Sequence, residues 1–275
     1  MRTATAHINC LLICVAACTA NAHDGPHDVI AQLDHKIEVE GASARLLVAR
    51  ADEHVVLGHN ELAKNDYLGA YELNQNASGA LMGLARLALE AGEPDVAIAW
   101  SRRGVEATKL TGFEPAFYAL MARAHAMNDQ HAQEREAWSA AIASAHPQTE
   151  WLLAHADATR RSVGDEAALE ALAVAREKNP SVLIERAQIE LLIEVGQIVN
   201  ARELLEQRGV PRGASRLVLW AKLVAAEGDR KTASEYLQNA IDQWSLQIDR
   251  VQSNPLVESD LAEAISWREA HLCQP

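Results

Sequence analysis

Residues 91–104, AGEPDVAIAWSRRG, contain the pattern from which the fold can be inferred. Gly92 suits the tight turn between two helices, and Pro94 suits the first turn of a helix, where its missing N–H costs nothing. Ala97 and Gly104 lie five and twelve residues after Gly92, and small residues let two helices approach closely. The segment therefore predicts a turn followed by a helix that packs against the helix before it.

The same pattern recurs along the chain. Each copy has an apolar helical stretch, a turn residue, and a second stretch with small residues at fixed offsets. The turn residues, separated by 34, 36, 36, 32 and 32 residues, are Gly58, Gly92, Asn128, Gly164, Gly196 and Gly228. One hairpin cannot bury its own apolar face, so we expect the copies to stack and share a continuous core.

This repeat resembles the tetratricopeptide repeat, a helix–turn–helix unit of about 34 residues. The resemblance covers roughly residues 44–246, and it rests on the turn glycine with small residues five and twelve positions later. The copies near Asn128 and Gly164 depart from the pattern. The resemblance implies an all-α fold, a right-handed α-α superhelical solenoid of about six hairpins with capping helices.

The expected organisation has four parts. They are a signal peptide at 1–22, a leader and capping helix at 23–43, the repeat domain at 44–246, and a C-terminal capping helix at 247–275. Both terminal segments show apolar residues at helical spacing. A solenoid needs such caps because its first and last layers would otherwise expose apolar surface.

The first 22 residues have the features of an export signal. A short apolar stretch is followed by the small-x-small site Ala20-Asn21-Ala22, with cleavage before His23. A second interpretation is a bacterial lipobox, VAAC, which would make Cys18 a lipidated first residue and tie the protein to a membrane. Both interpretations stay open, and both predict an exported protein that is periplasmic or extracellular.

Composition argues against several functions. The formal net charge of −13 at pH 7 repels phosphate backbones, so a nucleic-acid partner is not expected. The sequence has no nucleophile elbow, P-loop, dinucleotide-binding glycine pattern or helical zinc motif. We therefore expect a protein that is not an enzyme and requires no cofactor. It would meet a membrane only if Cys18 carries a lipid.

The resemblance implies that the first helix of each hairpin lines a groove for a protein or peptide partner. The positions expected to face it are Arg45, Asp52, Arg86, Glu90, Tyr118, His125, Trp151, Arg161, Arg186, Glu190 and Lys222. The basic side chains suit an acidic or C-terminal segment. They do not recur at one register position, and charged helix residues are commonly solvated or paired with neighbours.

Four aromatic residues, by contrast, are expected to pack in the core. Tyr67, Trp100, Trp138 and Tyr236 fall eight to ten residues after their turns, in the second helix of a hairpin. Rings at this spacing fill the space between neighbouring helices.

Two alternative functions follow from other features. His23, as a first residue followed by His27 and acidic residues, would suit a metal-binding or metal-delivery protein. An enzyme on an α-hairpin scaffold would need paired carboxylates or a His–acid pair deep in the groove, with Glu90 and Glu190 as candidates.

Overall fold

The computed structural model describes residues 25–272, except 110–111, 145, 208–212 and 251–253. Within these residues the chain forms helices, turns and loops, and no β-strand. No helix in this part of the chain is long and apolar enough to cross a membrane. The expected signal segment, with Cys18 and His23, lies outside the described residues.

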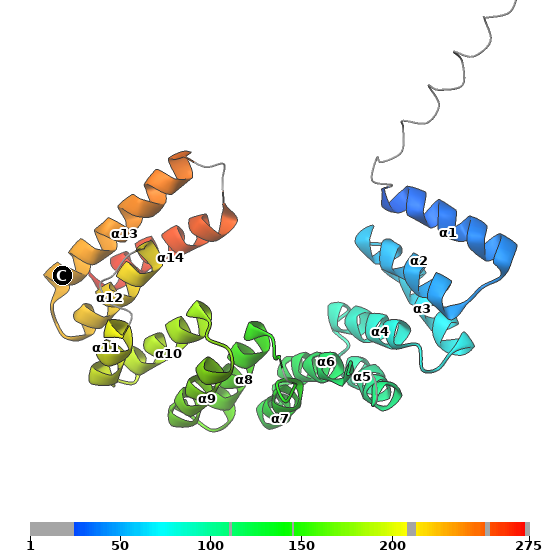
Figure 1. Ribbon diagram of the computed structural model, residues 1–275, viewed down its shortest axis with the longest axis horizontal. Coiled ribbons are helices and arrows are strands. Elements are labelled where there is room, and N and C mark those ends of the chain that lie inside the picture. The colour runs from blue at the N-terminus through cyan, green and yellow to red at the C-terminus, as the bar shows by residue number, and fades with distance from the viewer. Residues whose placement is uncertain (1–24, 110–111, 145, 208–212, 251–253, 273–275) are drawn as a thin grey trace, which may run out of the picture. The chain divides into compact units, whose positions relative to one another are not determined.

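The helices follow one another in pairs, as the repeat pattern predicts (Figure 1). Helix α1 (Pro26–Glu40) precedes the pairs, and α14 (Pro255–His271) follows them. The pairs are α2 (Ala44–Val56) with α3 (Asn60–Leu73), α4 (Ser78–Glu90) with α5 (Pro94–Thr108), α6 (Glu114–Met127) with α7 (His131–Ala141), α8 (Thr149–Ser162) with α9 (Asp165–Lys178), α10 (Val182–Glu194) with α11 (Ile198–Glu206), and α12 (Ala214–Ala226) with α13 (Arg230–Arg250).

The described residues up to Ala124 form one compact unit, and those from His125 onward form a second. Helices α1 to α5 and most of α6 belong to the N-terminal unit, and α7 to α14 belong to the C-terminal unit. Each unit has its own apolar clusters.

The turns between paired helices use left-handed backbone conformations. Gly92 has a φ of 73°, a value that glycine adopts without a steric penalty. The other predicted turn glycines also have positive φ, and they are Gly58, Gly164, Gly196 and Gly228. Between α6 and α7 the positive φ, 55°, belongs to Asp129, one residue after the predicted Asn128.

In the N-terminal unit, glycines make room for aromatic rings. Tyr67 on α3 is 3% exposed, and a Cβ added to Gly83 on α4 would overlap its ring. Phe117 on α6 is fully buried, and a Cβ added to Gly104 on α5 would overlap that ring in the same way. These small residues therefore set how closely the helices approach.

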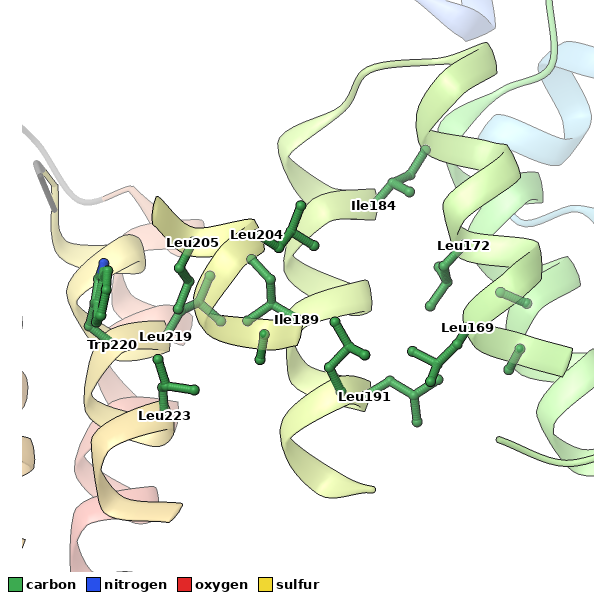
Figure 2. Packing of buried hydrophobic residues seen from close by; sticks show 14 of the residues in the cluster. Leu169, Leu172, Ile184, Ile189, Leu191, Leu204, Leu205, Leu219, Trp220 and Leu223 are labelled. Atoms are coloured by element: carbon green, nitrogen blue, oxygen red, sulfur yellow. The ribbon is translucent and has the colours of Figure 1, made fainter. Parts of the chain in front are cut away.

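In the C-terminal unit, one large apolar cluster runs from α8 to the start of α13. Figure 2 shows side chains of α9, α10, α11 and α12 lying between the helices, with Leu172, Ile189, Leu205 and Leu223 among them. Such a continuous layer is what stacked hairpins require, because each hairpin covers the apolar face of the next.

The predicted aromatic packing is confirmed. Tyr67 and Trp138 are buried, while Trp100 and Tyr236 are partly buried against the clusters of their own units.

The terminal helices cover apolar surface. Leu33 of α1 is 8% exposed, and Ile37 packs against the core of the N-terminal unit. Helix α14 buries Ala264 and partly buries Leu261 and Ile265 against α12 and α13. This contact brings the acidic residues of α14 close to α10 and α12.

Candidate partner-binding site

The first helices of the C-terminal unit bring three of the predicted groove residues together. Lys222 on α12 donates a hydrogen bond from Nζ to Oε1 of Glu190 on α10, at 2.7 Å. Arg186, one turn before Glu190, donates from Nε to the same oxygen at 3.3 Å. The two cations thus share one carboxylate.

Helix α14 adds two further carboxylates. Nη2 of Arg186 lies 3.0 Å from both carboxylate oxygens of Glu263, and Nζ of Lys222 lies 3.4 Å from Oε1 of Glu263. Asp260 lies 3.5 Å from Nη1 of Arg186. We call Arg186, Glu190, Lys222, Asp260 and Glu263 the charge cluster. It contains two positive and three negative side chains.

Two members of the charge cluster, Glu263 and Arg186, have pKa values shifted in favour of their charged forms. Burial acts to raise the pKa of Glu263, but the nearby charges of Arg186 and Lys222 outweigh burial and hold that pKa below its usual value. Burial acts to lower the pKa of Arg186, while the charges of Glu190 and Glu263 outweigh it and raise that pKa. Glu263 and Arg186 are therefore charged at neutral pH, although both are partly shielded from water.

A hollow of about 680 Å³ adjoins the charge cluster, between α10, α12 and α14. Ile193, Ala225, Leu272 and Trp267 give it an apolar lining, and the Trp267 ring stacks on His271 with centroids 4.6 Å apart. Its charged lining residues are Glu190, Glu194, Lys222, Arg230 and Glu263. We call this the C-terminal hollow.

A smaller hollow of about 250 Å³ continues along the same helix. It lies between α8 and α10, with residues of α9 at its base. Glu190 and Glu194 line both hollows. The surface available to a partner therefore extends from α8 to α14 along α10.

Two predicted groove residues of this unit lie in other contacts. Arg161 on α8 donates to both oxygens of the Glu134 carboxylate, at 2.7 and 2.8 Å, and to Asp157 at 2.8 Å. His125 is 7% exposed, and its Nδ1 lies 2.7 Å from Oε1 of Gln130. Trp151 is partly buried. Their role in partner binding stays a prediction.

In the N-terminal unit, three predicted residues gather around the hydroxyl of Tyr67. The hydroxyl donates a 2.5 Å hydrogen bond to Oδ1 of Asp52, and the charges of Arg86 and Glu90 also act on it. Burial, and then the bond to Asp52, raises the pKa of Tyr67 above its ordinary value. The remaining two residues are Arg45, which is exposed, and Tyr118, which is partly buried.

Sequence reasoning missed the residues that α14 contributes. Asp260 and Glu263 are three apart and so lie near one face of a helix, which the sequence does show. Arg186 is 77 residues away from Glu263, and no local pattern links them.

Only one of the two histidines proposed for a metal site lies among the described residues. His23 lies outside it, and His27 is exposed on α1. In the described ranges no three His, Cys, Asp or Glu side chains form a group that could hold a metal ion.

Comparisons with known proteins concern the fold. No family model matches the chain, and no curated protein matches its sequence. A tetratricopeptide repeat protein from Parabacteroides merdae is similar in structure, with a TM-score of 0.50, 13% identity, and coverage of 87% of this chain and 92% of that one. The pilF protein of Pseudomonas aeruginosa gives a TM-score of 0.53, 16% identity, and coverage of 82% and 97%. The chain has the tetratricopeptide-repeat fold that its sequence predicts.

Proposed function

We propose that this chain of tetratricopeptide-repeat fold is a non-catalytic scaffold that binds a partner protein or peptide on α10, α12 and α14. The observation that carries the proposal is the C-terminal hollow, about 680 Å³, beside the predicted groove residues Glu190 and Lys222. Sites that accept a ligand commonly have volumes of about 300 to 1,000 Å³. The hollow therefore has room for an anchoring side chain and its neighbours.

The lining of the hollow defines the partner's chemistry. Trp267, Ile193 and Ala225 offer apolar contact, and binding energy at interfaces concentrates where an apolar anchor displaces water from such a pocket. The rim carries both signs of charge, with Lys222 and Glu194 among its members, and rim charges set orientation more than affinity. A fitting segment has a large apolar side chain flanked by basic and acidic residues.

The partner would be met outside the cytoplasm. This part of the proposal is supported by the export features of residues 1–22, which leave a start at His23 or at a lipidated Cys18. The intact mass of protein purified separately from soluble and membrane fractions distinguishes the two. A mass that retains residues 1–22 in all fractions would contradict export by either route.

Peptide selection followed by blocking of the hollow tests the proposal. Twelve-residue peptides are selected by display against the purified chain, and their Kd is measured by fluorescence anisotropy. Ala226 lines the hollow and is exposed, so Ala226→Trp fills the space without disturbing the core. Ala262 is an exposed alanine of α14 that does not line the hollow, so Ala262→Trp is the matched control.

We expect Ala226→Trp to weaken binding by about tenfold or more, because a filled pocket cannot accept the anchor. The control should bind like the unmodified chain, and both variants should keep their helical circular dichroism. Peptides that bind both variants equally well would place the binding surface elsewhere.

A further inference from the structure

A second groove lies on different helices of the C-terminal unit. It runs between α7 and α9 with α8 at its base, and its volume is about 720 Å³. We call it the α7–α9 groove. It shares no lining residue with the C-terminal hollow, and none of the groove residues predicted from the sequence lines it.

A histidine provides the polar centre of this groove. His155 projects from α8, and its Nε2 lies 2.9 Å from Oγ of Ser139 on α7. This contact ties the imidazole ring to the α7 wall. Burial lowers the pKa of His155, and the charges of Arg135 and Lys178 lower it further. The ring therefore lies in a positive electrostatic potential.

The two cations of the groove have no partner of their own. Neither Arg135 on α7 nor Lys178 on α9 has a hydrogen-bond or ion-pair partner among the residues that the structure describes. Two arginines on first helices differ, since Arg161 on α8 and Arg186 on α10 are held by carboxylates. Two unpaired cations that line one groove, together with a histidine, form a surface suited to an anion.

The remaining lining residues limit what that anion is. Glu136 and Glu170 also line the groove, so a ligand carrying many negative charges would be repelled. Leu152, Val174 and Ile142 supply apolar surface beside the cations. These cationic, acidic and apolar lining residues together favour a ligand with a single carboxylate flanked by apolar groups.

We propose that the α7–α9 groove binds an acidic peptide segment, with one side-chain carboxylate held by Arg135, Lys178 and His155. Apolar side chains on either side of that carboxylate pack on Leu152 and Val174. The groove is open to solvent, so a small carboxylic acid would leave much of its surface in water, whereas a peptide covers both walls. The scaffold then offers two separate recognition surfaces within one unit.

Histidine NMR on the full chain tests this site with defined peptides. The probe is acetyl-Leu-Glu-Leu-amide, the neutral comparison is acetyl-Leu-Gln-Leu-amide, and the third peptide is acetyl-Leu-Leu with a free C-terminal carboxylate. The ring resonance of His155 is assigned by its loss in His155→Gln. We expect the glutamate peptide to shift this resonance and to raise the pKa of His155, and the glutamine peptide to do neither.

The other outcomes overturn the proposal. A response to the free C-terminal carboxylate, with none to the glutamate peptide, would contradict recognition of a side-chain carboxylate. Equal responses to the glutamate and glutamine peptides would contradict charge recognition. A ring that responds to no peptide would contradict the site as a whole.

A charge variant tests the two cations directly. Arg135→Gln combined with Lys178→Gln should weaken binding of the glutamate peptide by about tenfold, since each charge-assisted hydrogen bond is lost. Arg176 lies on α9 but does not line the groove, so Arg176→Gln is the matched control and should bind normally. A double variant that binds as tightly as the unmodified chain would overturn the proposal.

Discussion

Arg161 on α8 holds both carboxylate oxygens of Glu134 on α7, at 2.7 and 2.8 Å. Glu134 is 3% exposed, and Arg161 is its nearest cation, while Nδ1 of His131 lies 3.6 Å from Oε2 of the same carboxylate. Arg161 occupies a position that the sequence assigns to a partner groove. In the folded chain its guanidinium also fastens α8 to α7.

Removing Arg161 should therefore destabilise the C-terminal unit. We expect Arg161→Ala to lower the free energy of unfolding by about 3 kcal/mol, because Glu134 is left buried without its counter-charge. Urea denaturation followed by circular dichroism measures this. Arg160→Ala is the neighbouring control, and its exposed pairs with Asp165 and Glu194 are worth less than about 1 kcal/mol.

A double variant separates the pair from simple packing. Glu134→Leu with Arg161→Met should recover most of the lost stability, because no buried charge remains unpaired. If Arg160→Ala and Arg161→Ala destabilise equally, the Arg161–Glu134 pair does not have the structural role assigned to it.

A glycine in the N-terminal unit should be equally intolerant of change. Gly104→Ala should destabilise the protein by about 1 to 3 kcal/mol, because the added methyl overlaps the fully buried ring of Phe117. Gly69→Ala on α3 is the control, since its Cβ would meet only Cδ1 of Leu47, at 3.2 Å. Thermal unfolding compares the Tm values of the two variants. A rise in Tm for Gly104→Ala would contradict the close packing of the Phe117 ring against Gly104.

The α7–α9 groove predicts how His155 titrates. Its pKa should lie below 6.5, and it should rise in the Arg135→Gln, Lys178→Gln variant without reaching that value, because burial is the larger cause. The charged side chains that line the groove with it are Arg135, Glu136, Glu170 and Lys178. NMR titration of the ring gives both values, and an unchanged pKa in the variant would contradict the assigned electrostatics.

The same shift has a consequence for stability. With a lowered pKa in the folded state, the unfolded chain binds more protons, so the free energy of unfolding falls as pH drops below about 6.5. His155→Gln should reduce this slope between pH 6.5 and the folded-state pKa. Equal slopes for the variant and the unmodified chain would exclude a contribution from His155.

Glu263 should make the free energy of unfolding depend on pH in the acidic range. Its pKa is lowered by Arg186 and Lys222, so its stabilising contribution is present at neutral pH and is lost as pH falls through the folded-state pKa. Glu263→Gln should flatten the acid side of the stability profile by less than about 1 kcal/mol, because half of the side chain is exposed. Glu269→Gln, an exposed change on the same helix, should leave the profile unchanged.

The sequence predicts the hairpins because their signals are local. Gly92 adopts a positive φ without help from any distant residue. Ala97 is fully buried because its small side chain lets the two helices of one hairpin pack closely. In the degenerate copy near Asn128, the local pattern locates the turn only to within one residue. There the chain turns at Asp129, a residue type that tolerates the left-handed region better than most.

The sites depend on contacts between hairpins, which the sequence does not encode locally. The meeting of Glu263 with Arg186 depends on how α14 packs across α12. The α7–α9 groove depends on two second helices, whereas the repeat register drew attention to the first helices. Arg135 and Lys178 lie on those second helices and are therefore absent from the predicted groove residues. His155 lies on the first helix α8, at a position that the repeat register does not place in the groove.

Mapping a selected peptide onto the chain is the most direct test of the proposed partner-binding surface. Amide resonances of ¹⁵N-labelled protein are followed as a display-selected peptide is added. We expect the largest changes at Glu194, Lys222, Ala226 and Trp267, which line the C-terminal hollow on α10, α12 and α14. Changes confined to α1 to α5, with these four residues unaffected, would contradict the proposed function.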